Sequence, residues 1–222
     1  MRIDLHNVSK GRRGLALPAT TIGFESGRAT LTRAETEQRP TVLGLMAAGR
    51  MRPDTGTVTV NGRADASAIR RRVALVDAPG VSDPAPDVTV AGVAAEELMF
   101  AGIPSHPVSV SNWLHDLGLA ASARVPIANV APRDRLRLLT ELAILRDGVE
   151  GLVLVSPDRH GGDPIAWWEL ARTLADRGFA VLVIAGDASA AAIAADTMLA
   201  RMQGDETDEI TEHEAIAEGG LA

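Results

Sequence analysis

The chain has 222 residues and a formal net charge of −7, and 46% of its residues are hydrophobic but only 3% are aromatic. It has no cysteine, which excludes disulfides, thiolate metal sites and a cysteine nucleophile. Its only lysine is Lys10, so no other position can supply a phosphate-binding or Schiff-base lysine. The length suits one domain of ordinary size with a substantial core.

Five segments have the hydrophobic pattern of strands. Residues 3–8 and 57–60 alternate apolar with polar side chains, which favours edge-type strands of a mixed sheet with an antiparallel β part at the N-terminus. Residues 73–76, 152–155 and 180–184 are short continuous apolar runs, typical of strands covered on both faces. These runs predict a buried parallel sheet.

Helical periodicity lies between these strands. It covers residues 41–48, 133–145 and 165–175, and the last of these begins after Asp163-Pro164, a common helix start. Helical patterns without a convincing strand fill the middle of the chain. We therefore expect a single domain of the α/β class, built in three parts: an α/β core over residues 1–87 and 150–203, an inserted helical subdomain over 88–149, and an acidic tail over 204–222.

The net charge of the chain is concentrated in this tail. Seven acidic residues and no lysine or arginine follow Met202, whereas the rest of the chain has 22 acidic and 22 basic residues. The balanced body argues against a nucleic-acid partner. Residues 211–214 have the pattern of a capping box and predict a short helix. Because the first residues lack a signal-peptide pattern and no apolar run approaches about 20 residues, we expect a cytoplasmic protein.

The order of these segments is similar to a known family. Residues 41–56, followed by Val58–Gly62, resemble the segment after the phosphate-binding loop in the ATP-binding subunits of ABC transporters. Further similar segments follow in the family's order: Arg71–Val76, Asp87–Val90, Gly161–Pro164, and Ala195–Leu199 in place of the closing strand. The resemblance covers nearly the whole chain and implies a P-loop NTPase-like core with an inserted helical subdomain.

The resemblance places the phosphate-binding loop at residues 33–40. Such a loop has the pattern Gly-x-x-x-x-Gly-Lys-Ser/Thr, in which glycines let backbone N–H groups surround the phosphates and the hydroxyl holds magnesium. Here Arg39 stands at the lysine position and Pro40 at the hydroxyl position, directly before Thr41, and Glu35 and Glu37 bring carboxylates toward the phosphates. Arg39 either contacts an anion or is solvated.

The other nucleotide-site positions also differ from the family. Ser156 and Pro157 stand where the magnesium-binding aspartate and the catalytic glutamate are implied, and neither can act as a carboxylate base. Asp158 is either a shifted acid or a turn residue, whereas Asp163 of the Asp-Pro pair is retained. The γ-phosphate sensor, the switch histidine and the signature loop correspond to Ala78, Gly186 and residues 128–132.

Two further residue types are open to more than one interpretation. His160 is the only loop histidine beside acidic residues, and it is either solvated or a ligand or base. Trp167 and Trp168 point to different sides of a helix, so one is expected in the core and the other at the surface, where a tryptophan can mark an interface.

The resemblance without its nucleotide site implies a pseudo-ATPase with no bound ATP or magnesium. In the family, the helical subdomain and the sheet form a groove for a cytoplasmic helix of a membrane subunit. We therefore expect a non-hydrolytic accessory or scaffold subunit that has an integral membrane partner and lies at the inner face of the cell membrane. Two alternatives are a subunit that pairs with an intact ABC ATPase chain and a soluble homodimeric regulatory protein.

Overall fold

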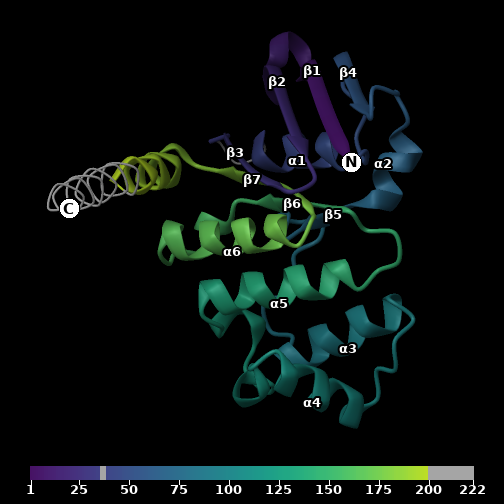
Figure 1. Ribbon diagram of the computed structural model, residues 1–222, viewed down its shortest axis with the longest axis vertical. Coiled ribbons are helices and arrows are strands. Elements are labelled where there is room, and N and C mark those ends of the chain that lie inside the picture. The colour runs from purple at the N-terminus through teal and green to yellow at the C-terminus, as the bar shows by residue number, and fades with distance from the viewer. Residues whose placement is uncertain (36–38, 200–222) are drawn as a thin grey trace, which may run out of the picture.

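The computed structural model describes residues 1–35 and 39–199 (Figure 1). The predicted acidic tail and its capping box at residues 211–214 lie outside the described residues, as does Glu37 of the predicted phosphate loop.

The N-terminal part of the chain forms a three-stranded antiparallel sheet. Strand β1 (Arg2–Lys10) lies between β2 (Leu17–Glu25) and β4 (Thr55–Val60). The prediction that residues 3–8 form an edge-type strand is therefore wrong. The alternation arises because only one face of this sheet is buried, and Ile3 and Leu5 lie on that face.

A second sheet of four parallel strands forms the centre of the molecule. Its order is β3 (Arg28–Arg33), β7 (Ala180–Ala185), β6 (Gly151–Val155) and β5 (Val73–Val76). Every residue of β5, β6 and β7 is buried. The continuous apolar runs are therefore confirmed as strands covered on both faces, and the α/β fold class is confirmed with them.

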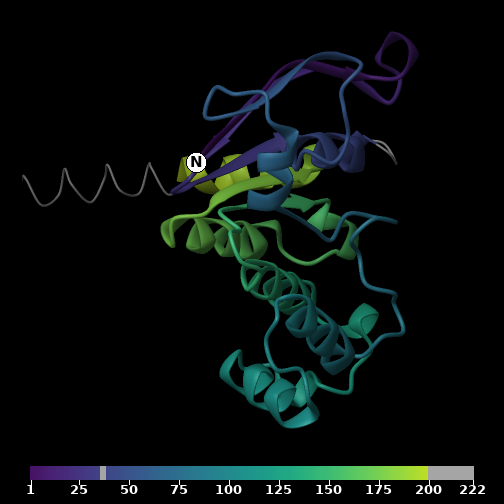
Figure 2. The same cartoon turned by 90° about the vertical axis from the view of Figure 1, so that its right-hand side faces the viewer.

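Helices cover both faces of the parallel sheet (Figures 1 and 2). Helix α1 (Arg39–Ala47) lies between the two sheets, and α2 (Ala66–Arg72) connects β4 to β5. On the opposite face α6 (Pro164–Asp176) contacts β3 and β7, and α5 (Pro132–Ile144) lies against α6 and β5.

The most distant layer consists of α3 and α4, beyond α5 (Figure 2). Their bounds, with those of the short 3-10 helices, are α3 Val90–Phe100, α4 Pro107–Asp116, η1 Arg12–Gly14, η2 Ala120–Ser122, η3 Ile127–Asn129 and η4 Pro157–His160. Residues 88–149 thus contain helices and turns but none of the strands of the two sheets, although the exact division of the chain stays a prediction.

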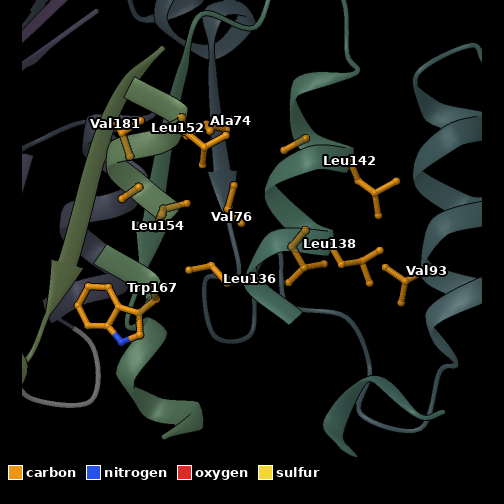
Figure 3. Packing of buried hydrophobic residues seen from close by; sticks show 14 of the residues in the cluster. Ala74, Val76, Val93, Leu136, Leu138, Leu142, Leu152, Leu154, Trp167 and Val181 are labelled. Carbon is orange, nitrogen blue, oxygen red and sulfur yellow. The ribbon is translucent and has the colours of Figure 1, made fainter. Parts of the chain in front are cut away.

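Two apolar clusters stabilise these layers. One lies between the two sheets and includes the buried face of α1. The other begins on the opposite face of the parallel sheet and continues through α6 and α5 to α3 and α4. Figure 3 shows Leu154 and Trp167 near the sheet and Leu138 and Val93 at the contact between α5 and α3.

The chain after β7 differs from the predicted closing strand. Residues 187–199 are helical, and Met198 and Leu199 are exposed on this helix. The physical reason is composition, because residues 190–195 are five alanines and one isoleucine, and alanine has the highest helix propensity.

Helix α1 approaches the parallel sheet closely at Gly44. A Cβ atom at this position would lie 2.7 Å from Val155 Cγ2 and 3.1 Å from Leu75 Cδ1. We expect Gly44→Val to lower the free energy of unfolding by about 2–3 kcal/mol through overpacking. Urea denaturation would measure this loss, and adding Val155→Ala should restore part of it because it empties the occupied space. Wild-type stability of Gly44→Val would contradict the close packing.

Candidate functional site

The carboxyl ends of the four parallel strands meet at one edge of the sheet, which is where open α/β folds bind their ligands. Glu35 lies just beyond β3, Asp77 follows β5, Ser156 follows β6 and Gly186 follows β7. The edge therefore brings together several of the positions that the sequence singled out, and it adds Asp77, which the sequence did not.

The N-terminus of α1 holds the predicted phosphate-loop residues. Arg39 and Pro40 are the first two residues of this helix, and Thr41 follows in its first turn. Pro40 is buried and has no backbone N–H to offer an anion. The Nε atom of Arg39 is buried and has no hydrogen-bond partner among the described residues. This helix start thus lacks one of the backbone donors that usually bind phosphate.

The end of β6 turns sharply at Ser156, which has a left-handed backbone with φ of 48°. Pro157 is buried and begins η4. The Asp158 carboxylate accepts hydrogen bonds from the Gly186 N–H at 2.8 Å and from Ser189 Oγ at 3.4 Å. Asp158 therefore links η4 to the start of the helix at residues 187–199. From sequence, Asp158 was either a shifted acid or a turn residue, and neither alternative included this contact.

Two other acidic residues also bind helix starts. Glu35 Oε1 accepts a hydrogen bond from the Asp187 N–H at 2.7 Å, so its carboxylate stabilises the first turn of the helix at 187–199. Asp163 caps α6, because its Oδ1 accepts from the Ile165 N–H at 2.9 Å. In this structure both carboxylates are engaged with backbone donors of the chain itself.

Asp77 is the centre of a buried ionic cluster. Its Oδ1 lies 2.7 Å from Arg135 Nη2 and 3.0 Å from Arg159 Nη2. Its Oδ2 lies 2.9 Å from His160 Nε2 and 3.2 Å from Arg135 Nε. The side chains of Asp77 and Arg135 are only 2% and 5% exposed. We call these four residues the Asp77 cluster.

The Asp77 cluster connects three parts of the fold. Asp77 follows β5, Arg159 and His160 lie on η4, and Arg135 lies on α5. Arg159 also donates to the Asp77 and Val155 backbone carbonyls, and it lies 3.6 Å from Asp83. The cluster therefore holds the carboxyl ends of β5 and β6 against α5, and it satisfies the charges that it buries.

The environment of Asp77 stabilises its charged form. Burial alone would raise the pKa of this carboxyl, but the hydrogen bonds with His160 and Arg135 and the charge of Arg159 outweigh burial and lower the pKa below its ordinary value of 3.8. Since a carboxylate can only accept, His160 Nε2 carries the hydrogen of this contact.

This lowered pKa predicts a pH-dependent contribution to stability. The contribution is complete above the unfolded pKa and is lost as the pH falls through the folded pKa. We expect the stability difference between the wild type and Asp77→Asn to be constant above about pH 5 and to shrink below about pH 4. Urea denaturation of both proteins over this range would measure it. A difference that stays constant in acid would show that folding does not lower the pKa of Asp77.

Sequence reasoning missed this cluster. It left His160 open as a solvated residue or as a ligand or base, whereas the His160 side chain is 27% exposed and contacts Asp77. A signal was nevertheless available, because Asp77 follows one buried apolar run and Arg159 and His160 follow the next. Opposite charges just beyond two parallel strands are expected to meet at the same sheet edge.

Other polar groups lie away from this edge or do not converge. Lys10 donates to Asp54 at 2.6 Å and to the Arg52 carbonyl at 2.9 Å, beside the β1–β4 pair. Among residues 1–35 and 39–199, no three His, Asp or Glu side chains are arranged to hold a metal ion. None of the helices described has the length and apolar character needed to cross a bilayer.

A groove of about 580 Å³ opens beside the Asp77 cluster, between the sheet and the outer helices. Helix α3 contributes Glu97 and Phe100, and α5 contributes Leu139. Arg50 follows α1, and Arg146 follows α5. We call it the α3–α5 groove.

Solved structures with a similar fold are ATP-binding subunits of ABC transporters. One is described as the ATP-binding subunit of an ABC transporter; it is 15% identical, with a TM-score of 0.55 over 84% of this chain and 80% of its own. Another, named as an ABC transporter ATP-binding protein from Pyrococcus furiosus, is 12% identical, with a TM-score of 0.59 over 84% of this chain and 92% of its own. No family model and no curated protein matches the sequence.

These similarities define the class of fold. The chain has the fold of ABC ATP-binding subunits, with a P-loop NTPase-like core, as its sequence predicted. At these identities the likeness concerns the fold, and the chemistry of the site has to be argued from the residues themselves.

Proposed function

We propose that the protein is a non-hydrolytic accessory or scaffold subunit of a membrane transporter-like complex. The observation that carries this proposal is the Asp77 cluster. At the sheet edge where such a fold would bind its nucleotide, two arginines and a histidine are directed at a carboxylate of the same chain.

The residue types at this edge also support the absence of hydrolysis. Phosphoryl transfer depends on positioned phosphates, a metal ion and an oriented water, which together supply nearly all of the rate enhancement. Here Pro40 stands at the hydroxyl position, and Ser156 and Pro157 stand at the carboxylate positions. The nearby carboxylates of Glu35 and Asp158 accept hydrogen bonds from the backbone of residues 186–187.

We expect calorimetry to show no saturable binding of Mg-ATP at concentrations up to about 1 mM, because the sequence of residues 33–40 contains no glycine and Ser156 and Pro157 carry no carboxylate. An ABC ATP-binding subunit that has all its motifs, titrated in parallel, provides the positive control. Micromolar binding that is abolished by Arg39→Ala would contradict the proposal. ATPase activity that appears only on mixing with a second ABC-type chain would favour the alternative of a mixed dimer.

The scaffold role rests on the α3–α5 groove. The groove lies between the outer helices and the sheet, and Phe100 and Val81 on its rim are 65% and 50% exposed. Exposed apolar side chains beside a groove are characteristic of protein docking sites. We assign this groove to a cytoplasmic segment of an integral membrane subunit, which would hold the protein at the inner face of the membrane.

Affinity isolation from native membranes tests this role. The wild-type chain should recover an integral membrane protein, and Phe100→Asp should lose it because a buried charge would face the partner's apolar side chains. Val108→Asp is the matched control, because Val108 is 64% exposed on α4 and does not line this groove. Equal recovery by all three chains, or a chain found entirely free of membranes, would contradict the proposal.

A further inference from the structure

Another pocket lies at the end of α1 that is remote from the sheet edge. It has a volume of about 520 Å³ and lies between the end of α1, the loop at residues 50–54, β4 and α2. Its apolar lining includes Met46, Met51 and Ile69. We call it the α1–α2 pocket. Because α1 begins at Arg39 and Gly49 follows its end, the pocket is separate from the positions at which the fold would bind a nucleotide.

Positive charge is concentrated around this pocket. Residues 50–72 contain six arginines and two aspartates, although the chain before the acidic tail is electrically balanced. Three of these arginines line the pocket: Arg50, Arg52 and Arg70. Among residues 1–35 and 39–199, no carboxylate lies within ion-pair distance of any of the three. Within the described part of the chain, the pocket therefore holds three unpaired cations.

The two aspartates of this segment are engaged by other groups. Asp54 lines the pocket, but its carboxylate accepts hydrogen bonds from Lys10 Nζ at 2.6 Å and from the Gly11 N–H at 2.9 Å. The Asp65 carboxylate caps α2 by accepting a hydrogen bond from the Ala68 N–H at 2.9 Å. Neither carboxylate pairs with an arginine of the pocket.

The structure holds these arginines close to one another. Arg70 Nη1 donates to the Gly49 carbonyl at 3.0 Å, which positions this guanidinium at the end of α1. The pKa of Arg50 is lowered by partial burial first, and then by the positive charges of Arg146 and Arg70. Arg50 stays protonated at neutral pH, so like charges face one another in the unbound protein. A bound anion would relieve this repulsion and would accept charge-assisted hydrogen bonds.

A phosphate group matches this arrangement better than a carboxylate does. A phosphate monoester carries a charge of about −1.5 to −2 at pH 7 and has three strong acceptor oxygens. Planar guanidinium groups bind such oxygens in pairs. The pocket also has an apolar floor, because Met46 and Ile69 are fully buried. The rest of the ligand is therefore expected to be apolar.

We infer that the α1–α2 pocket binds a phosphate monoester through Arg50, Arg52 and Arg70. The apolar part of the ligand lies against Met51 and Val58, which also line the pocket. A lipid with a phosphate headgroup and a small soluble phosphate ester both present this chemistry. The inference goes beyond the proposed docking function and does not depend on it.

Titration of the ¹⁵N-labelled full chain with hexyl phosphate, followed by NMR, tests the inference. We expect saturable shifts of the amides of residues 49–58 and 66–70, with a dissociation constant on the order of 1 mM. Inorganic phosphate should bind about tenfold more weakly because it lacks the apolar contact. Hexanoate should also bind about tenfold more weakly, because it carries a single charge and fewer acceptor oxygens.

Matched variants show whether the pocket or the general charge of the chain binds the ligand. Arg52→Gln should weaken hexyl phosphate about tenfold, because it removes a charge-assisted contact. Arg124→Gln is the matched control, because Arg124 is exposed and lines a different pocket, and it should bind like the wild type. Arg39→Ala should also bind like the wild type, because Arg39 lies at the other end of α1. The NMR spectrum of each variant reports directly on its fold.

Vesicles of phosphatidylcholine with and without phosphatidic acid distinguish the two sources of the phosphate. If the wild type sediments with the vesicles that contain phosphatidic acid, and Arg52→Gln does not, the ligand is a lipid. If hexyl phosphate binds but the protein does not sediment with these vesicles, the ligand is a soluble phosphate ester.

Three results would overturn the inference. The pocket amides could fail to respond saturably to hexyl phosphate at up to about 20 mM, hexanoate could bind as tightly, or Arg52→Gln and Arg124→Gln could bind equally well. Loss of binding in Arg39→Ala with full binding in Arg52→Gln would place the ligand at the nucleotide position instead. None of these results bears on recovery of a membrane protein through the α3–α5 groove, so the two proposals are judged separately.

Discussion

Asp77→Asn is expected to lower the free energy of unfolding by about 3–5 kcal/mol, because it removes the partner of a buried charge. Arg135 is 5% exposed, and its guanidinium would lose the opposite charge of the carboxylate and one of its two acceptors on residue 77, because the amide nitrogen of asparagine cannot accept a hydrogen bond. Urea denaturation at neutral pH, followed by circular dichroism, would measure the loss.

Two further variants make this prediction specific to the Asp77 cluster. Asp116→Asn is the matched control, because the Asp116 side chain is 84% exposed, and it should change stability by no more than about 0.5 kcal/mol. Adding Arg135→Met to Asp77→Asn removes the uncompensated charge and should recover a large part of the loss. If Asp77→Asn is as stable as Asp116→Asn, the cluster does not hold the sheet edge together.

Trp167→Ala is expected to destabilise the protein by about 3–5 kcal/mol through loss of buried surface and creation of a cavity. Trp167 is 2% exposed and belongs to the cluster that joins the sheet to α5 and α6, as Figure 3 shows. The measurement is the same urea denaturation.

Its neighbour provides the matched control. Trp168 is partly exposed and lies beside β3, where it lines two surface pockets. Trp168→Ala should therefore lower the free energy of unfolding by less than half as much as Trp167→Ala. Similar losses for both substitutions would mean that α6 is not anchored through the side that the structure buries.

The sequence predicted the buried elements of this fold better than the exposed ones. The three apolar runs identified β5, β6 and β7 because strands covered on both faces need apolar side chains throughout. No strand was assigned over β2 and β3, where threonine, glycine and arginine interrupt the pattern. Those strands have exposed or half-exposed positions, so burial imposes no continuous signal on them.

The candidate site was predictable only in part. The family resemblance located Arg39, Pro40, Ser156 and Pro157, and the structure places all four at the ends of elements along the sheet edge. The Arg135 partner of Asp77 is 58 residues away in sequence, and this pairing depends on where α5 lies against the strands. Sequence periodicity does not contain that information.

The apolar cluster around α5 has a consequence for local unfolding. It runs without a break from β6 and β7 to Leu114 of α4, and the Asp77–Arg135 contact lies across the same junction. Releasing α3 and α4 alone would expose one side of α5 to water, including Leu138 and Leu142. The free energy of this partial opening is therefore close to that of a larger opening. Amide protons in α5 should therefore exchange with solvent at rates close to those of the central strands, and the helical part behaves as part of one cooperative unit.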